Sequence, residues 1–251
     1  MKIIVFLFPV VLFCVYFSIK FIAPSTYLEF IKEDSFVENA QALFFFLSSI
    51  VSFWAARRFI KIKLVLHGVL YGILAVGLFF IFGEEISWGQ RIFNITTLDY
   101  FEKHNFQHET NIHNLNAILP FLEYGYILIG FYGASAWLFK LLMPQARTKR
   151  NHLANFVAPD WHVSMYFFCC FFIYTTVYFT KYKPNEYFWM RDHEFAELLL
   201  ALGFLFFAAT NYVKSLVCLS DGEEQKKLWE KKYDRRMACF TGIIVLAVSG
   251  G

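Results

Sequence analysis

The chain has 251 residues, of which 58% are hydrophobic, 21% are aromatic and only 17% are charged. Soluble domains average about 45 to 50% apolar and about 25% charged residues, so this composition excludes a soluble globular enzyme. The formal net charge is only +3, and the basic residues lie beside apolar segments instead of forming a domain of their own. This excludes a nucleic-acid-binding protein and leaves an integral membrane protein with the lipid bilayer as its partner.

Long apolar stretches predict a single all-α domain, a bundle of six transmembrane helices. A helix that crosses about 30 Å of hydrocarbon needs roughly 20 mostly apolar residues, and six segments meet or approach that length. A further apolar segment, residues 237–251, would be only about 22 Å long as a helix, so it is either an interfacial tail or a partial seventh span of a longer protein. The six predicted spans are residues 3–23, 37–56, 64–83, 117–139, 163–180 and 193–213.

The first span is predicted to be a retained anchor and not a signal peptide. Its apolar run is long, and no small-x-small cleavage site precedes Pro24. Basic residues then predict a cytoplasmic N-terminus. Sixteen of the 23 Lys and Arg residues fall on one side, because they are Lys2 or lie within 57–63, 140–150 and 214–236. The last of these segments is predicted to form a charged cytoplasmic helix.

Ionisable residues gather at the outer ends of four predicted spans. A charge in hydrocarbon costs several kcal/mol unless it is paired or hydrated, so these side chains should face the bundle interior or a wet cavity. Their similar depth predicts one shared polar cluster. Such a cluster suits a cation, a cationic substrate or a proton path. Ordinary solvated charge in the loops is the simpler alternative. The residues are Glu38, Glu84, Glu85, Glu123, His193, Glu194 and Glu197.

The third span ends in the string GEEISWGQRIF, residues 83–93. If the helix continues, Glu84, Ser87 and Arg91 share one face, whereas Glu85 lies about 100 degrees away. Two adjacent carboxylates at a hydrophobic boundary suit general acid–base catalysis, and this makes Glu84, Glu85 and Arg91 the catalytic candidates. The structural alternative is an ion pair between Arg91 and Glu84 that caps the helix, with Trp88 as an interfacial anchor.

The outer loop, residues 84–116, adds candidates for metal binding. The order His108-Glu109-x3-His113 has one residue more than the His-Glu-x2-His motif of zinc proteases, which rotates His113 off the face of His108. His104 and His108 stand four residues apart, as do two further pairs. Imidazole and carboxylate ligands suit zinc or another divalent ion, although loop histidines are often only solvated. The predicted metal ligands are Glu109, His113, His193 and Glu197.

The same string resembles an uncharacterised family of bacterial multi-pass inner-membrane proteins. The resemblance rests on GEEISWGQRIF, on the later Glu109-x-Asn111-x-His113-Asn114 and on Glu33-Asp34, and it covers roughly residues 24–125. It implies a bacterial inner-membrane location and brings no assigned activity. The residues that match its motif are Glu84, Glu85, Arg91, Glu109, His113 and Asn114.

A weaker resemblance is to membrane hydrolases of the alkaline ceramidase and progestin-receptor type, which are seven-helix proteins with a zinc site. It rests on Glu38-Asn39 followed by Ser48-Ser49. Their Asp with paired His residues on late helices is not reproduced, because the sixth predicted span offers only His193.

Three functions follow from these patterns. The first is a metal-dependent, membrane-embedded hydrolase of a lipid-linked or periplasmic substrate, with Glu84 or Glu85 as general base and Arg91 meeting an anionic head group. The second is a proton- or cation-coupled transporter that uses the same carboxylates. The third is a non-catalytic membrane scaffold subunit whose polar cluster, which includes Asn114 and Glu123, is an ion-paired network.

Overall fold

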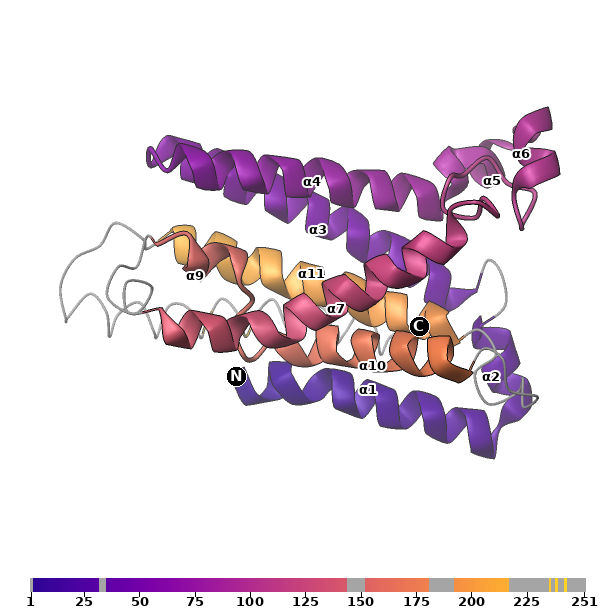
Figure 1. Cartoon of the computed structure of the whole chain (residues 1–251), viewed down its shortest axis with the longest axis horizontal. Helices are drawn as coiled ribbons and strands as arrows, with labels where there is room; N and C mark the ends of the chain where they lie inside the picture. Colours follow the sequence, from indigo (N-terminus) through magenta and orange to yellow (C-terminus); the bar gives the residue numbers. More distant parts are fainter. Residues whose placement is uncertain are drawn as a thin grey trace.

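The computed structural model describes residues 2–31, 35–143, 152–180 and 192–216, together with Arg235, Ala238 and Gly242. Apart from residues 214–216, the predicted segments 214–236 and 237–251 lie almost wholly outside the described residues. The regular structure in the described part is helical, with one isolated antiparallel bridge between Asn105 and Leu115. The helices, shown in Figure 1, are α1 (Lys2–Ile22), α2 (Pro24–Ile31), α3 (Phe36–Lys61), α4 (Val65–Glu85), η1 (Ser87–Gly89), α5 (Gln90–Phe93), α6 (Asp99–His104), α7 (Leu119–Leu142), α9 (Ala154–Val157), α10 (Ser164–Thr180) and α11 (Asp192–Ser215).

Five helices are long and apolar enough to cross a membrane: α1, α3, α4, α7 and α11. This confirms the prediction of an all-helical chain and is consistent with the predicted membrane protein. The remaining predicted span corresponds to α10, a shorter apolar helix of 17 residues. The second predicted span ends later than expected, since α3 continues past residue 56 to Lys61.

The other four long apolar helices and α10 are arranged around α11. In an 18-residue apolar window, 83% of the residues of α11 are buried, against 17% in α1 and in α7. Helix α11 packs against α3 on one side and α10 on the other, α4 covers α3, α7 packs on α10, and α1 also contacts α10. Small residues such as Ala196, Ala201 and Ala208, all fully buried, let neighbouring helices approach α11 closely.

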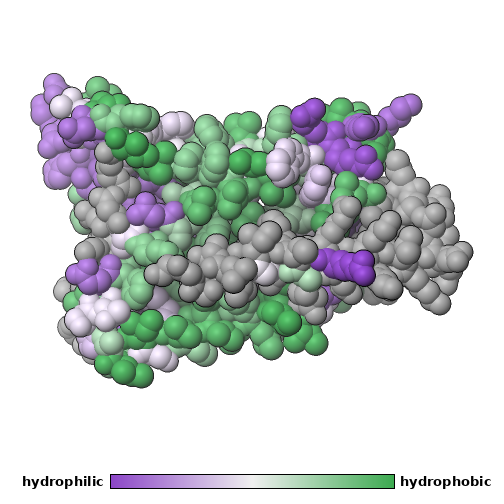
Figure 2. Space-filling model, turned by 180° about the vertical axis from the view of Figure 1, so that it is seen from behind, coloured by the Kyte–Doolittle hydropathy of each residue, from purple (hydrophilic) through white to green (hydrophobic). Residues whose placement is uncertain are grey.

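The two ends of the bundle carry different short elements. Helices α2, α5 and α6 lie at one end, which we call the α6 end, and α9 lies at the other, which we call the α9 end (Figure 1). Figure 2 shows apolar side chains across the middle of one face, with hydrophilic residues gathered towards its two ends. An apolar band between polar ends is the distribution expected of a bilayer-spanning bundle.

Two glycines allow α7 and α10 to touch. A methyl group on Gly133 would lie 2.1 Å from Cγ of Phe167, and one on Gly130 would lie 2.8 Å from the backbone nitrogen of Phe171. Both distances are far below van der Waals contact, so the two backbones approach at a place where only hydrogen fits.

Replacing Gly133 by Ala should therefore destabilise the bundle by about 1 to 3 kcal/mol through overpacking against Phe167. Thermal unfolding in detergent, followed by circular dichroism, measures the change. Gly125→Ala is the matched control in the same helix, because nothing lies within 4 Å of its added methyl group. Equal melting temperatures for the two variants would contradict the prediction.

A buried ion pair at the α6 end connects the first helix with α11. Lys20 Nζ lies 2.5 Å from Asp192 Oδ2, and both side chains have no exposed surface. The other carboxylate oxygen accepts hydrogen bonds from the hydroxyls of Tyr16 at 2.9 Å and Tyr27 at 2.8 Å. Asp192 is thus the acceptor that joins α1, α2 and α11.

A second ionic cluster lies at the α9 end. Asp160 contacts Lys140 from α7 and Lys214 from α11, the latter at 2.8 Å, and Lys214 also donates to the carbonyl of Asn155. Burial alone would raise the pKa of Asp160, but the two ammonium groups lower it below its usual range. Each end of the bundle is thus held by a buried or half-buried ion pair.

Candidate acidic cavity at the end of the bundle

A cavity of about 580 Å³ opens at the α6 end, between α3, α4, α7, α10, α11 and the loop after α6. It contains most of the polar residues that the sequence singles out, and we call it the acidic cavity. Five of its lining residues are carboxylates and two are imidazoles. The predicted residues that line it are Glu38, Glu85, His113, Asn114, Glu123, His193, Glu194 and Glu197. The other lining residues are Phe106, Gln107, Leu119, Leu122, Tyr126, Tyr174, Val177 and Tyr178.

Glu197 is held in a defined orientation at the cavity wall. One of its carboxylate oxygens accepts a hydrogen bond from the Tyr174 hydroxyl, and the other accepts one from Nε2 of Gln41 at 2.8 Å. Glu85 lies close enough to Glu197 for their charges to interact. Gln41 and Tyr174 escaped the sequence analysis because both are uncharged, although Gln41 lies one helical turn after Glu38 and on the same span.

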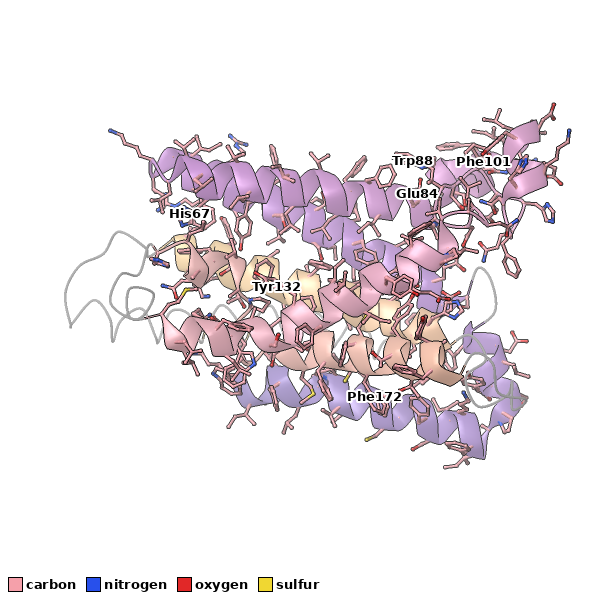
Figure 3. All side chains as sticks on the ribbon, in the orientation of Figure 1. His67, Glu84, Trp88, Phe101, Tyr132 and Phe172 are labelled. Atoms are coloured by element: carbon pink, nitrogen blue, oxygen red, sulfur yellow. The ribbon has the colours of Figure 1, made fainter. Side chains whose placement is uncertain are left out.

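Glu84, although adjacent to Glu85, serves a different purpose. Its Oε2 accepts the backbone N–H groups of Ile112 at 2.6 Å and His113 at 2.9 Å, and its Oε1 accepts the indole N–H of Trp88 at 2.6 Å. Glu84 and Trp88 lie together where α4 ends (Figure 3). The carboxylate therefore fastens the loop to the helix, whereas Glu85 faces the cavity.

The helix does not continue beyond Glu85, which is the condition that a shared face of Glu84, Ser87 and Arg91 requires. Three successive residues, Ser87, Trp88 and Gly89, have positive φ angles of 46°, 53° and 81°. Left-handed backbone cannot continue a right-handed helix, so Glu84, Ser87 and Arg91 do not share a helical face. The side chain of Arg91 lies outside the described residues.

The other polar residues of the string hold the loop from α6 to α7. The Ser87 hydroxyl donates to Glu109, Asn111 Nδ2 donates to Ser87 at 2.9 Å, and Gln90 Oε1 accepts the N–H of Thr110 at 2.6 Å. Each partner in these bonds lies 20 or more residues further along the chain. Residues 83–93 therefore stabilise the conformation of the loop between α6 and α7.

Two of the three pairs spaced four residues apart do not lie on a helix. Helix α6 ends at His104, so His108 is not one turn further along it, and the segment that carries Glu109 and His113 is not helical. Glu109 does not line the acidic cavity. His193 and Glu197 do stand one turn apart on α11, where His193 Nε2 lies 3.5 Å from Glu194.

Among the described residues, no group of three or more His, Cys, Asp or Glu side chains is arranged to hold a metal ion. The predicted set of Glu109, His113, His193 and Glu197 is not assembled, because Glu109 is bonded within the loop to Ser87 and Asn111.

His113 is the imidazole that lies beside a carboxylate at the cavity. Its Nδ1 lies 3.5 Å from Oε2 of Glu84, and its side chain is 27% exposed at the cavity. Burial disfavours the charged ring, but Glu84 and the nearby Glu85 and Glu197 outweigh that effect and raise the pKa of His113 above its ordinary value. An imidazole paired with a carboxylate on one side is the arrangement in which histidine serves as a general base.

Removing the Glu84 carboxylate should loosen the loop without unfolding the bundle. In Glu84→Ala, the amide groups of Ile112 and His113 lose a charged acceptor, so their hydrogen exchange should accelerate roughly tenfold to a hundredfold. Hydrogen exchange with mass spectrometry checks this, with α11 amides as the internal reference. Glu102→Ala is the control, since that side chain is 57% exposed. Unchanged exchange at residues 112–113 would show that Glu84 does not hold the loop.

In comparison with known proteins, no family model, no curated protein and no solved structure matches the chain.

Proposed function

We propose that the chain is a multi-pass protein of the bacterial inner membrane, with six spans, a cytoplasmic N-terminus and the acidic cavity on the outer side. The five long apolar helices support spanning, and α10 is within the lower limit of length for a transmembrane helix. The basic residues within 57–63, 140–150 and 214–236 support the orientation.

Within that membrane, we propose a hydrolase that acts on a lipid-linked or periplasmic substrate. The observation that carries this proposal is the position of His113 on the cavity wall, backed by Glu84 and accompanied by Glu85 and Glu197. A base and acidic groups that converge on one cavity of ligand size are what water-mediated hydrolysis requires.

In the proposed reaction, the imidazole of His113 accepts a proton from a water molecule whose oxygen attacks the scissile carbon or phosphorus. The bond to the leaving group breaks, and the carboxyl group of Glu85 gives that group its proton. Proton transfer from His113 back to Glu85 restores both side chains. Glu84 touches no reacting atom and positions His113.

Products of hydrolysis provide the test. The protein in lipid nanodiscs is incubated with a bacterial membrane lipid extract and with periplasmic extract, and mass spectrometry identifies new products. Wild type should form a product that His113→Asn does not form. His108→Asn is the control, because His108 lies outside the cavity and has a φ of 58°, which Asn tolerates well. Absence of any product from wild type would contradict the hydrolase.

A cation- or proton-coupled transporter is the second candidate, and the five carboxylates of the cavity favour it. Flux of protons or monovalent cations into sealed vesicles, abolished by Glu85→Gln, would support transport. A protein with neither product nor flux would fit the scaffold subunit.

A further inference from the structure

We propose that segment 88–98, which follows α4, lies in the interface between the outer leaflet and water and holds the acidic cavity at the level of the lipid head groups. The substrate that fits this arrangement is the head group of an outer-leaflet lipid. The inference rests on the proposed function for the membrane and its outer side, and it selects a lipid over a soluble periplasmic substrate.

The first argument is the distribution of side chains in segment 88–98. Its polar side chains turn towards the loop between α6 and α7. Nε2 of Gln90 donates to Thr97, whose hydroxyl donates to the carbonyl of His108 at 2.8 Å. Its large apolar side chains are exposed, which is the reverse of the order found in a water-covered loop, so an apolar medium covers them. Their exposed fractions are 48% for Trp88, 68% for Ile92, 72% for Phe93, 57% for Ile95 and 60% for Leu98.

The second argument identifies that medium as lipid. The apolar side chains of Val76, Phe79 and Phe80 are exposed on α4, one of the five long apolar helices. The ring of Phe80 meets the ring of Trp88 at a centroid distance of 5.5 Å. The indole also lies against Gly83, where an added methyl group would be 2.9 Å from it. The exposed apolar surface of α4 thus continues into segment 88–98, and the lipid that covers the first also covers the second.

The third argument is depth. Helix α4 has 21 residues and is about 31 Å long, so it crosses the hydrocarbon by itself and the segment after it lies among the head groups. Trp88 suits that level, because its ring contacts α4 while its N–H group donates to Glu84. Asn94 and Thr96 are exposed, and their polar groups need water or head groups. Figure 1 shows α5 at the level along the bundle at which α1 ends, and α1 is still apolar and exposed there, at Ile22.

Segment 88–98 is joined to the wall of the acidic cavity. Glu84 accepts the indole N–H of Trp88 with one oxygen and the backbone N–H of His113 with the other. Oε1 of Gln90 accepts the N–H of Thr110, four residues before Asn114. His113 and Asn114 both line the cavity. Segment 88–98 therefore sets the depth of the cavity wall, and a lipid head group at that depth meets His113 without leaving its leaflet.

Photo-crosslinking identifies what covers segment 88–98. The full chain carries p-benzoylphenylalanine in place of Phe93, of Phe79 on α4 or of Lys103 on α6, and is irradiated in vesicles of phosphatidylethanolamine and phosphatidylglycerol. Mass spectrometry should find lipid adducts at positions 93 and 79, and at least tenfold fewer at the exposed position 103. Adducts at position 93 with a second copy or with another segment of the chain in place of lipid, or a lipid yield as low as at 103, would overturn the inference.

Fluorescence quenching measures the depth. Phe93→Trp adds one indole to segment 88–98, and the signal of wild type is subtracted. Lipids brominated beside the head group should quench the added fluorescence at least twofold more than lipids brominated at the chain end, and Lys103→Trp should escape both. Stronger quenching by chain-end bromine would place the segment in the hydrocarbon, and absence of quenching would place it in water. Either result would overturn the inference.

The substrate class has a separate measurement. The hydrolase assay is run on bacterial lipid extract and on the water-soluble fraction of the same extract after deacylation. Product should form at least tenfold faster from the intact lipids. Equal rates from both would retain the hydrolase and reject the lipid substrate. Lipid adducts at position 93 without product from any extract would reject the hydrolase and retain the interfacial position of segment 88–98.

Discussion

Replacement of Lys20 by Met is expected to lower the free energy of unfolding by about 3 to 5 kcal/mol, because it leaves the buried carboxylate of Asp192 without its counter-ion. Lys20 and Asp192 have no exposed surface, and the hydroxyls of Tyr16 and Tyr27 donate hydrogen bonds without supplying charge. Equilibrium unfolding in mixed micelles with increasing denaturing detergent measures the loss.

The double variant Lys20→Met/Asp192→Asn is the decisive control. The amide still accepts hydrogen bonds from both tyrosines but carries no charge, so it should recover most of the stability that the single variant loses. Lys103→Met, at an exposed lysine of α6, should change stability by less than about 0.5 kcal/mol. A single Lys20→Met variant as stable as wild type would mean that the ion pair does not hold α1.

The second large effect is expected on activity. In the hydrolase assay, His113→Asn should lower the rate by about 10²- to 10⁴-fold, the range that general acid–base catalysis contributes. Burial opposes the imidazolium form, but Glu84, Glu85 and Glu197 raise the pKa of His113 above its ordinary value near 6.5. A base must be unprotonated, so the wild-type rate should increase as the pH rises through that raised pKa.

The variant Glu84→Gln tests whether Glu84 acts on His113 through its negative charge or only by holding the loop. The amide oxygen still accepts hydrogen bonds from the loop, but the negative charge beside His113 is gone. Since that charge stabilises the imidazolium, the rising limb of the pH–rate profile should move to lower pH. Glu102→Gln should leave the profile in place. A rising limb that does not move in Glu84→Gln would show that Glu84 does not act on His113.

Hydropathy alone was enough to predict an all-helical membrane protein, because the length and apolarity of a span are local properties of the sequence. Hydropathy did not predict the backbone conformation of the residues that follow α4. Nothing about Ser87 or Trp88 indicates positive φ, since Gly89 is the residue that usually marks it. The left-handed turn ends the helix at Glu85. Glu84 then bonds to the loop, whereas Glu85 lines the acidic cavity.

The site was predictable where ionisable residues occur at similar depth, and less so where partners are distant or uncharged. Glu38, Glu123 and Glu197 were singled out from their positions at span ends, and they line one cavity. Gln41 was not predicted because it is uncharged, although it bonds to Glu197. The Lys20–Asp192 pair joins residues 172 positions apart, and no local pattern relates them.

That separation has a consequence for the order in which the protein is inserted into its membrane. The ribosome completes α1 long before it makes α11. The ammonium group of Lys20 therefore has no access to the carboxylate of Asp192 while the intervening helices are synthesised. Until then its charge is best solvated by water or lipid head groups, because burial without a partner is too costly. Helix α1 therefore takes its final place only after Asp192 has been synthesised and can pair with Lys20.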